Sequence, residues 1–270
     1  MTTVLFSIPV HESNDTIRDT IVNVRRFAGQ EHPIMLHVSA SWAGFDAGIG
    51  QLPNVYVNPQ RWSTAHAHSQ VPTHVSSFLQ AEGLGLRFDR MAIMHTSELL
   101  IRQGMPDHIS AYDHSAWFTP DTQPVDPLWP PMNHVRQLAP GFRSYLGNLL
   151  EGSWYSRSLF HDMCAWIMRR WSLADLMLPV ALEESLFPTL AWDLTQGSPY
   201  SHPYCAFKHD QHFLADRSFI EDICAGRPVT FWQPHNFVYD YAPFPSQGIF
   251  SVKRIDRRLE DPMRMMVRQL

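Results

Sequence analysis

Residues 3–10 read Thr-Val-Leu-Phe-Ser-Ile-Pro-Val, and residues 34–38 read Ile-Met-Leu-His-Val. Both are short apolar runs of the kind that forms a buried strand, and polar residues follow each of them. Apolar residues between the two runs recur at helical spacing, so we expect a helix that has Asn14 or Asp15 as its N-cap and that ends at Gly29. The first forty residues therefore predict strand, helix and strand, the βαβ unit of a parallel sheet.

The polar residues that follow these two strands form a first candidate site. They are His11 and Glu12 after the first strand, and Ser39 and Ser41 after the second. Ligands of open α/β sheets bind in the crevice outside the carboxyl ends of the strands. We therefore expect these four side chains to face a ligand.

The remaining pattern also fits a parallel sheet covered by helices. Strands are expected at residues 55–57 and 90–95, and helices at residues 64–82, 156–170 and 186–194. Residues 112–140 are rich in Pro, Asp, Trp and His, which predicts a large functional loop whose tryptophans contact a ligand. The tail from residue 229 has a strand-like start, a Pro-rich turn and a basic end. The predicted fold class is a single α/β domain with a mainly parallel central sheet flanked by helices.

Composition narrows the function classes. The chain has 270 residues, of which 44% are hydrophobic, enough for one large core. A formal net charge of −5 argues against nucleic acid as a partner. Three cysteines without paired spacing argue against a disulfide framework and a thiolate zinc site. No apolar run approaches the ~20 residues that a membrane span requires, and the N-terminus lacks signal-peptide features, so we expect a cytoplasmic location.

Two adjacent carboxylates, Glu183 and Glu184, begin an apolar helical segment that reads Leu-Glu-Glu-Ser-Leu-Phe-Pro-Thr-Leu over residues 182–190. Glutamates in the first turn of a helix are stabilised by the helix dipole and are common without any catalytic role. A carboxylate whose surroundings tune its pKa can instead act as a general base that takes a proton from an attacking hydroxyl. Both interpretations stay open on this segment alone.

A basic cluster near the end of the chain contains Lys253, Arg254, Arg257 and Arg258. Such a cluster is often no more than a solvated face. Cations here could also stabilise the charge of an anionic ligand. The sequence contains no Asp-x-Asp, a motif that holds a divalent metal in other proteins.

The glutamate segment resembles the Pro-Asp-Glu-aromatic-any-aromatic-Ala-Thr-Leu segment of the core 2/I-branching N-acetylglucosaminyltransferases and peptide O-xylosyltransferases. Glu184 falls on the catalytic-base glutamate of that family, and Glu183 is the alternative base. Three residues of the segment depart from the family pattern, namely Leu182, Ser185 and Pro188.

Further stretches resemble the same family in the same order along the chain. Residues 3–38 resemble its opening nucleotide-binding unit, with Ser39 at the place of an aspartate. Residues 61–75 and 90–101 resemble a stretch with an acidic residue at the position of Glu98. Residues 152–157 resemble a segment that ends in a serine-arginine pair, here Ser156 and Arg157. Residues from 248 onward resemble a segment whose basic residues bind the donor diphosphate, a role that falls on Lys253 and Arg254.

The resemblance implies a GT-A-like nucleotide-sugar-binding fold in one domain, with residues 1–110 as the nucleotide-binding half and residues 111–270 as the acceptor and catalytic half. It implies an inverting glycosyltransferase, a hexosyl-, N-acetylhexosaminyl- or pentosyltransferase, that needs no metal. The co-substrate would be a nucleotide sugar, UDP-linked, and the second partner a glycan or other hydroxyl acceptor. The expected location favours a role in bacterial surface glycan synthesis. The implied catalytic residue is Glu184; the implied substrate-binding residues are His11, Glu12, Ser39, Glu98, Ser156, Arg157, Glu183, Lys253 and Arg254.

Two other hypotheses remain open. A nucleotide- or glycan-binding module without turnover would explain Ser39, which departs from the family aspartate. A metal-dependent hydrolase could be built on His66, His68 and His74, because imidazole is a common metal ligand. However, the first two of these would point to different sides of a helix, and no His-Glu-x-x-His pattern accompanies them. The sequence predicts no particular oligomeric state.

Overall fold

The computed structural model describes the chain except residues 1, 65–67, 118, 122–128, 209–213 and 231–244. The described residues form a seven-stranded sheet of order β3-β2-β1-β4-β7-β6-β8 and a three-stranded sheet of order β5-β10-β9. The strands are β1 (Val4–Val10), β2 (Ile34–Val38), β3 (Val55–Val57), β4 (Arg90–Ile93), β5 (Glu98–Leu100), β6 (His114–Ser115), β7 (Trp154–Ser156), β8 (Tyr200–Ser201), β9 (Cys205–Ala206) and β10 (Ser251–Lys253). The α-helices are α1 (Asn14–Phe27), α2 (Val71–Gly83), α3 (Met105–Ser110), α4 (Pro130–Leu138), α5 (Arg157–Met168), α6 (Glu183–Thr195), α7 (Arg217–Cys224) and α8 (Pro262–Val267).

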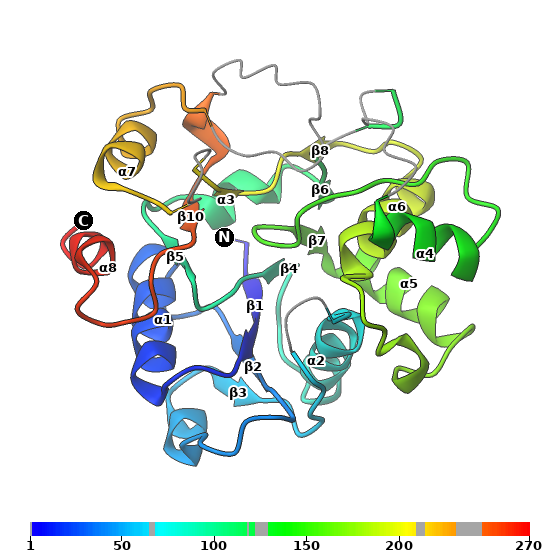
Figure 1. Ribbon diagram of the computed structural model, residues 1–270, viewed down its shortest axis with the longest axis horizontal. Coiled ribbons are helices and arrows are strands. Elements are labelled where there is room, and N and C mark those ends of the chain that lie inside the picture. Colours follow the sequence, from blue (N-terminus) through cyan, green and yellow to red (C-terminus); the bar gives the residue numbers. More distant parts are fainter. Residues whose placement is uncertain (1, 65–67, 118, 122–128, 209–213, 231–244) are drawn as a thin grey trace.

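The large sheet is mainly parallel. β1 pairs in parallel with β2 and with β4, and β2 pairs in parallel with β3. β7 enters between β4 and β6 and runs antiparallel to both. Figure 1 shows α1 on one side of this sheet and α2 and α5 on the other. The predicted α/β class, a mainly parallel central sheet flanked by helices, is therefore confirmed.

Alternating side chains of the strands build two cores, one on each face of the sheet. All seven residues of β1 are buried, and successive side chains point to opposite faces. Phe6 and Ile8 belong to the core that contains the apolar face of α1. Leu5 belongs to the core that contains the apolar residues of α2, α5 and α6. The strands are thus fixed on both faces, which makes their carboxyl edge a rigid support for a site.

Several expected element bounds were wrong. The N-cap of α1 is Ser13, whose hydroxyl accepts from the Thr16 N–H, one residue before the expected start. α2 begins at Val71 and not at residue 64, because Pro72 favours the first turn of a helix and has no N–H to offer to a preceding turn.

The segment 112–140 was expected to be a loop without regular elements, and this was also wrong. It contains the short strand β6 and the helix α4. Pro130 and Pro131 lie in the first turn of α4, where a missing N–H costs no hydrogen bond. Residues 118 and 122–128 of this segment lie outside the described residues. So does Pro243, the first proline of the expected Pro-rich turn, whereas Pro245 caps a short 3₁₀ helix.

Of the helices in the described ranges, none combines the length and the apolar character needed to cross a membrane. The three cysteines, Cys164, Cys205 and Cys224, are free thiols.

Candidate functional site

A cavity of about 810 Å³ lies at the carboxyl edge of the large sheet. It is lined by His11, which follows β1, and by His95 and Ser97, which follow β4. Glu151 lines it from the loop before β7. Because β7 runs antiparallel to β4, β7 begins at the edge of the sheet where β4 ends. The start of α6 and the end of β10 complete the lining; in Figure 1 they lie to either side of β4. This is the crevice in which open α/β sheets bind ligands.

Glu183 and Glu184 form the acidic side of the cavity, at the first turn of α6. The Glu183 carboxylate accepts a hydrogen bond from the Gln70 N–H at 2.7 Å, and burial raises its pKa to about 8. Burial also raises the pKa of Glu184 well above the ordinary value, and the carboxylates of Glu183 and Glu151 raise it further. Within the described residues, no hydrogen bond or ion pair occupies the Glu184 carboxylate. A carboxylate of raised pKa that faces a cavity is suited to accept a proton.

Lys253 and Glu151, which both line the cavity, form an ion pair that is largely buried. The Lys253 ammonium lies 2.9 Å from Glu151 Oε1, and both side chains are almost completely buried. Burial on its own raises the pKa of Glu151, but Lys253 and His95 outweigh it and lower the pKa to about 2. The His95 ring lies 3.6 Å from the same carboxylate oxygen, and burial lowers its pKa to about 3, so the imidazole is neutral.

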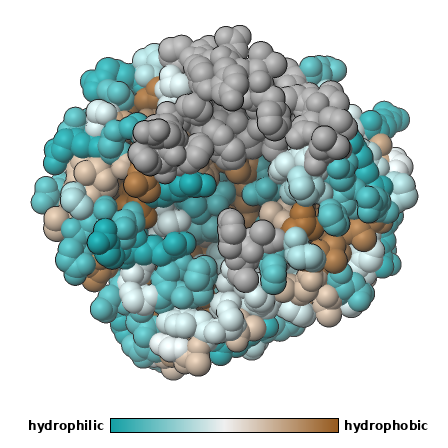
Figure 2. Space-filling model, in the orientation of Figure 1, coloured by the Kyte–Doolittle hydropathy of each residue, from teal (hydrophilic) through white to brown (hydrophobic). Residues whose placement is uncertain are grey.

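Lys253, Arg254 and Arg257 form the basic side of the cavity, at the end of β10 and just beyond it. Arg254 has a left-handed backbone with φ of 64°, a conformation that costs free energy in residues other than glycine. The Arg257 guanidinium pairs with the Glu12 carboxylate at 2.8 Å. In the view of Figure 2, hydrophilic residues, in teal, extend from the left edge of the molecule to its middle.

The polar residues that follow β1 and β2 make hydrogen bonds and an ion pair with neighbouring segments. His11 lines the cavity, and its Nδ1 lies 3.2 Å from the Thr64 hydroxyl. Ser39 is buried and does not line the cavity; its hydroxyl accepts from the Thr64 N–H at 3.2 Å. Glu12 does not line it either, but holds Arg257, which does. Ser39 and Glu12 thus support neighbours that line the cavity.

Glu98, expected to bind a sugar, is completely buried on β5 beside β10 and does not line the cavity. Its Oε1 accepts a hydrogen bond of 2.7 Å from the Ser251 hydroxyl, and burial raises its pKa to about 8. Its register partner in the antiparallel pairing is Lys253. Glu98 therefore lies behind the basic side of the cavity.

Ser156 and Arg157 lie at the amino edge of the sheet, away from the cavity. Ser156 is paired with Arg90 at the start of β4 and caps α5 by accepting from the Leu159 N–H. The Arg157 guanidinium makes a double hydrogen bond to Glu82, of 2.7 and 3.1 Å. The serine-arginine pair that resembled a family motif is thus a helix cap followed by a surface ion pair, and the structure does not bring it together with the other candidate residues.

Sequence reasoning missed six polar residues of the cavity, namely Thr64, Gln70, His95, Ser97, Glu151 and Asp256. A signal for one of them was present, because Glu151 is an isolated acid after Leu149 and Leu150 and before Gly152. His95 comes two residues after the last residue of β4, near the position that the crevice rule singles out.

The described residues do not support the hypothesis of a metal site built on histidines. They contain no group of three or more His, Cys, Asp and Glu side chains arranged to hold a metal ion. His74 is completely buried, with Nδ1 2.9 Å from the Ser7 hydroxyl. His66 lies outside the described residues, and His68 lines the cavity.

Comparisons with known proteins found similarity among solved structures. No protein-family model matches the chain, and no curated protein matches it. A nucleoside-diphosphate-sugar pyrophosphorylase from Vibrio cholerae RC9 has a similar structure, with a TM-score of 0.44, 8% sequence identity, and coverage of 74% of this chain and 91% of that one. TarS from S. aureus, residues 1–349, has a TM-score of 0.40 and 11% identity, with coverage of 75% of this chain and 60% of that one.

Proposed function

We propose that the protein is an inverting glycosyltransferase that moves a sugar from a nucleotide-sugar donor to a hydroxyl acceptor without a metal ion. The observation that carries the proposal is the pairing, in one cavity, of a carboxylate of raised pKa with a cluster of fixed cations. The first is suited to accept the acceptor's proton, and the second to receive a leaving diphosphate. The resemblance to the core 2/I-branching and O-xylosyltransferase family supports it at Glu184, Lys253 and Arg254, which all line this cavity.

The reaction would be a single displacement at the anomeric carbon. The acceptor oxygen forms the new bond to this carbon while its proton passes to the Glu184 carboxylate. The bond between the anomeric carbon and the diphosphate oxygen breaks, and the electron pair leaves with the diphosphate. Because attack and departure occur on opposite faces of the sugar, the configuration at the anomeric carbon is inverted.

The negative charge of the leaving group would be stabilised by the basic side of the cavity. Two of these cations already share their charge with a carboxylate, Lys253 with Glu151 and Arg257 with Glu12, so the three cations would supply the attraction together. Arginine suits this task because its planar guanidinium binds phosphate oxygens in pairs. In this mechanism the three cations perform the neutralisation for which other enzymes use a divalent metal.

The acceptor would enter beside Trp129, which lines the cavity from the start of α4. The Trp129 ring lies so close to Gly147 that a Cβ there would meet it at 2.4 Å. An aromatic ring at the edge of a cavity provides a surface on which a sugar can stack. A glycan acceptor fits this arrangement, and we propose a role in bacterial surface glycan synthesis.

The test is turnover of a panel of nucleotide sugars in the presence of EDTA, with simple sugars as acceptors. We expect one donor to be consumed, and NMR of the product to show the anomeric configuration opposite to that of the donor. Turnover that needs a divalent cation would overturn the metal-independent mechanism. Binding of a nucleoside diphosphate without any turnover would favour the non-catalytic module instead.

A further inference from the structure

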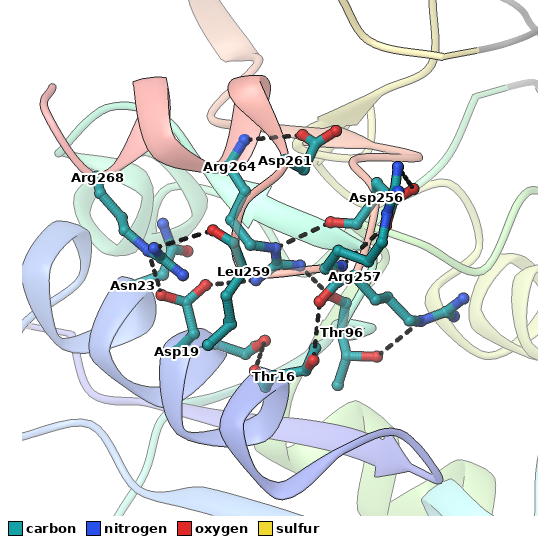
Figure 3. Close-up of polar contacts among 12 residues, drawn as sticks. Thr16, Asp19, Asn23, Thr96, Asp256, Arg257, Leu259, Asp261, Arg264 and Arg268 are labelled. Carbon is teal, nitrogen blue, oxygen red and sulfur yellow. Dashed lines mark hydrogen bonds and ion pairs between the residues drawn. The ribbon is translucent and has the colours of Figure 1, made fainter.

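A completely buried arginine, Arg264 of α8, joins the C-terminal helix to the segments that carry the cavity. Its Nη2 donates to the Thr96 carbonyl at 2.9 Å, and its Nε donates to the Asp256 carbonyl at 2.9 Å. Its Nη1 pairs with the carboxylate of Asp19 on α1. Figure 3 shows this guanidinium between α1, α8 and the segment that contains Asp256.

Both carbonyls belong to segments that line the cavity. Thr96 precedes Ser97, and Asp256 lies between Arg254 and Arg257. The two segments are also joined directly, because the Ile255 N–H donates to the Ser97 carbonyl at 3.1 Å. The guanidinium therefore fixes the backbone of two neighbouring cavity segments at once.

A second contact reaches the same segment from α1. The Thr16 hydroxyl donates to the Arg257 carbonyl at 2.8 Å. The backbone from residue 254 to residue 257 is thus held at Ile255, at Asp256 and at Arg257, three successive residues. This matters because Arg254 keeps a left-handed backbone, and such a conformation persists where the surrounding structure imposes it.

Burial of a charged side chain is a costly way to gain stability. Even a paired buried charge often contributes no more than apolar residues of the same volume would. The rigid, planar guanidinium can, however, hold a carboxylate and two carbonyls in one fixed arrangement, which an apolar side chain cannot do. The position of Arg264 therefore points to a geometric role.

We infer that Arg264 is a positioning residue that, through the carbonyls of Thr96 and Asp256, aims Arg254 and Arg257 into the cavity to bind a diphosphate. Arg264 itself does not line the cavity and acts through the backbone of its neighbours. The naming of a diphosphate as the ligand rests on the proposed function. The C-terminal helix is thereby a part of the donor site.

Arg268 of the same helix offers a matched control. It pairs with the same Asp19 carboxylate, at 2.7 Å, and its Nη1 donates to the Leu259 carbonyl. Among the hydrogen bonds of the described residues, the Thr96 and Asp256 carbonyls accept from Arg264 and not from Arg268, whose side chain is 40% exposed. Loss of Arg268 therefore disturbs the ion pair between α1 and α8 while it leaves the cavity segments held.

The experiment measures the affinity of inorganic pyrophosphate by isothermal titration calorimetry, with EDTA present. We expect Arg264→Lys to weaken binding about tenfold, because lysine keeps the charge but cannot hold both carbonyls and Asp19. Thr16→Val should weaken it about threefold by loss of one hydrogen bond. Arg268→Ala should bind as the wild type does. Circular dichroism and thermal unfolding establish that each variant is folded.

Thr16→Val keeps the inference testable if Arg264→Lys does not fold. Its own control is Thr16→Ser, which retains the hydroxyl and should restore the wild-type affinity. Wild-type affinity in a folded Thr16→Val or Arg264→Lys protein would overturn the inference and leave the proposed function standing. An equal loss in Arg268→Ala would also overturn it, because the effect would then come from the Asp19 ion pairs. If the wild type itself binds neither pyrophosphate nor any nucleoside diphosphate, the proposed function fails together with the inference.

Discussion

The acidic and basic sides of the cavity are built in opposite ways. Glu183 and Glu184 lie in the first turn of a helix, where burial raises the pKa of Glu183 to about 8 and that of Glu184 well above its ordinary value. The basic side is positioned through its backbone, at Ile255, Asp256 and Arg257. A proton acceptor must be able to change its charge near working pH, whereas a phosphate-binding group must not. The difference between the two sides matches this division of tasks.

Glu151 connects the two sides. It holds Lys253 by a buried ion pair, and its negative charge raises the pKa of Glu184. The same carboxylate therefore lowers the net charge of the basic side and increases the basicity of Glu184.

The largest effect is expected on the acidic side. Glu184→Gln keeps the size of the side chain and removes its basicity, so we expect transfer to fall by about 10²- to 10⁴-fold. Donor binding should be retained, because the basic side is unchanged. Steady-state kinetics and calorimetry measure the two quantities. Full transfer activity in the variant would show that Glu184 is not the base, and Glu183→Gln would then be the next variant to assay.

The second prediction compares the buried ion pair with an exposed one. Glu151→Gln leaves the Lys253 charge buried without its carboxylate, so the free energy of unfolding should fall by about 3 kcal/mol. Glu82→Gln removes the partner of Arg157 at the other edge of the sheet, where solvent screens the pair, and should cost less than about 1 kcal/mol. Urea denaturation measures both. Equal losses would mean that the cavity pair is as solvated as the surface pair.

The third prediction uses the raised pKa of Glu183. A carboxyl group whose pKa is about 8 in the folded state favours folding when protonated, below its ordinary value near 4.5, and this contribution is lost as the pH rises through 8. Glu183→Gln cannot ionise, and its amide oxygen can still accept from the Gln70 N–H. Relative to the wild type it should therefore gain stability between pH 5 and pH 8, on the order of 4 kcal/mol. A difference in unfolding temperature that does not change with pH would contradict the raised pKa.

The smallest effect is expected at the strained residue of the basic side. Arg254→Gly relieves a left-handed backbone, so the variant should be more stable by about 1 kcal/mol. It should also bind a diphosphate more weakly, because one cation of the cavity is lost. Thermal unfolding and calorimetry on the same sample separate the two effects. A loss of stability would show that the Arg254 side chain, which packs near the Phe207 ring, contributes more than the strain costs.

Much of the fold was predictable because it depends on local patterns. β2 and β3 have the expected bounds, and β1 begins one residue later than expected. The start of α2 was placed too early because Pro72 was not interpreted as the beginning of a helix, and α4 was missed because Pro130 and Pro131 were interpreted as irregular chain. Single patterns do not distinguish a proline that ends a helix from one that begins it.

The candidate site was predictable only in part. Glu183, Glu184, His11, Lys253 and Arg254 all line one cavity, as residues that follow strands or begin a helix at the carboxyl edge. Ser156 lies at the other edge because β7 runs antiparallel to β4, so that Glu151 before the strand faces the cavity and Ser156 at its end does not. The direction of a three-residue strand is decided by its partners in the sheet, which the sequence does not show.

The most direct test is a thermal-shift measurement of the wild-type protein against nucleoside diphosphates and their sugars, with EDTA throughout. A ligand at a hundredfold excess over its Kd stabilises the native state by about 2.7 kcal/mol. We expect one nucleoside diphosphate and its sugar to raise the unfolding temperature in EDTA, and Arg254→Ala to reduce the shift. A shift that appears only when a divalent cation replaces EDTA, or no shift with any nucleotide, would contradict a metal-independent nucleotide-sugar site in this cavity.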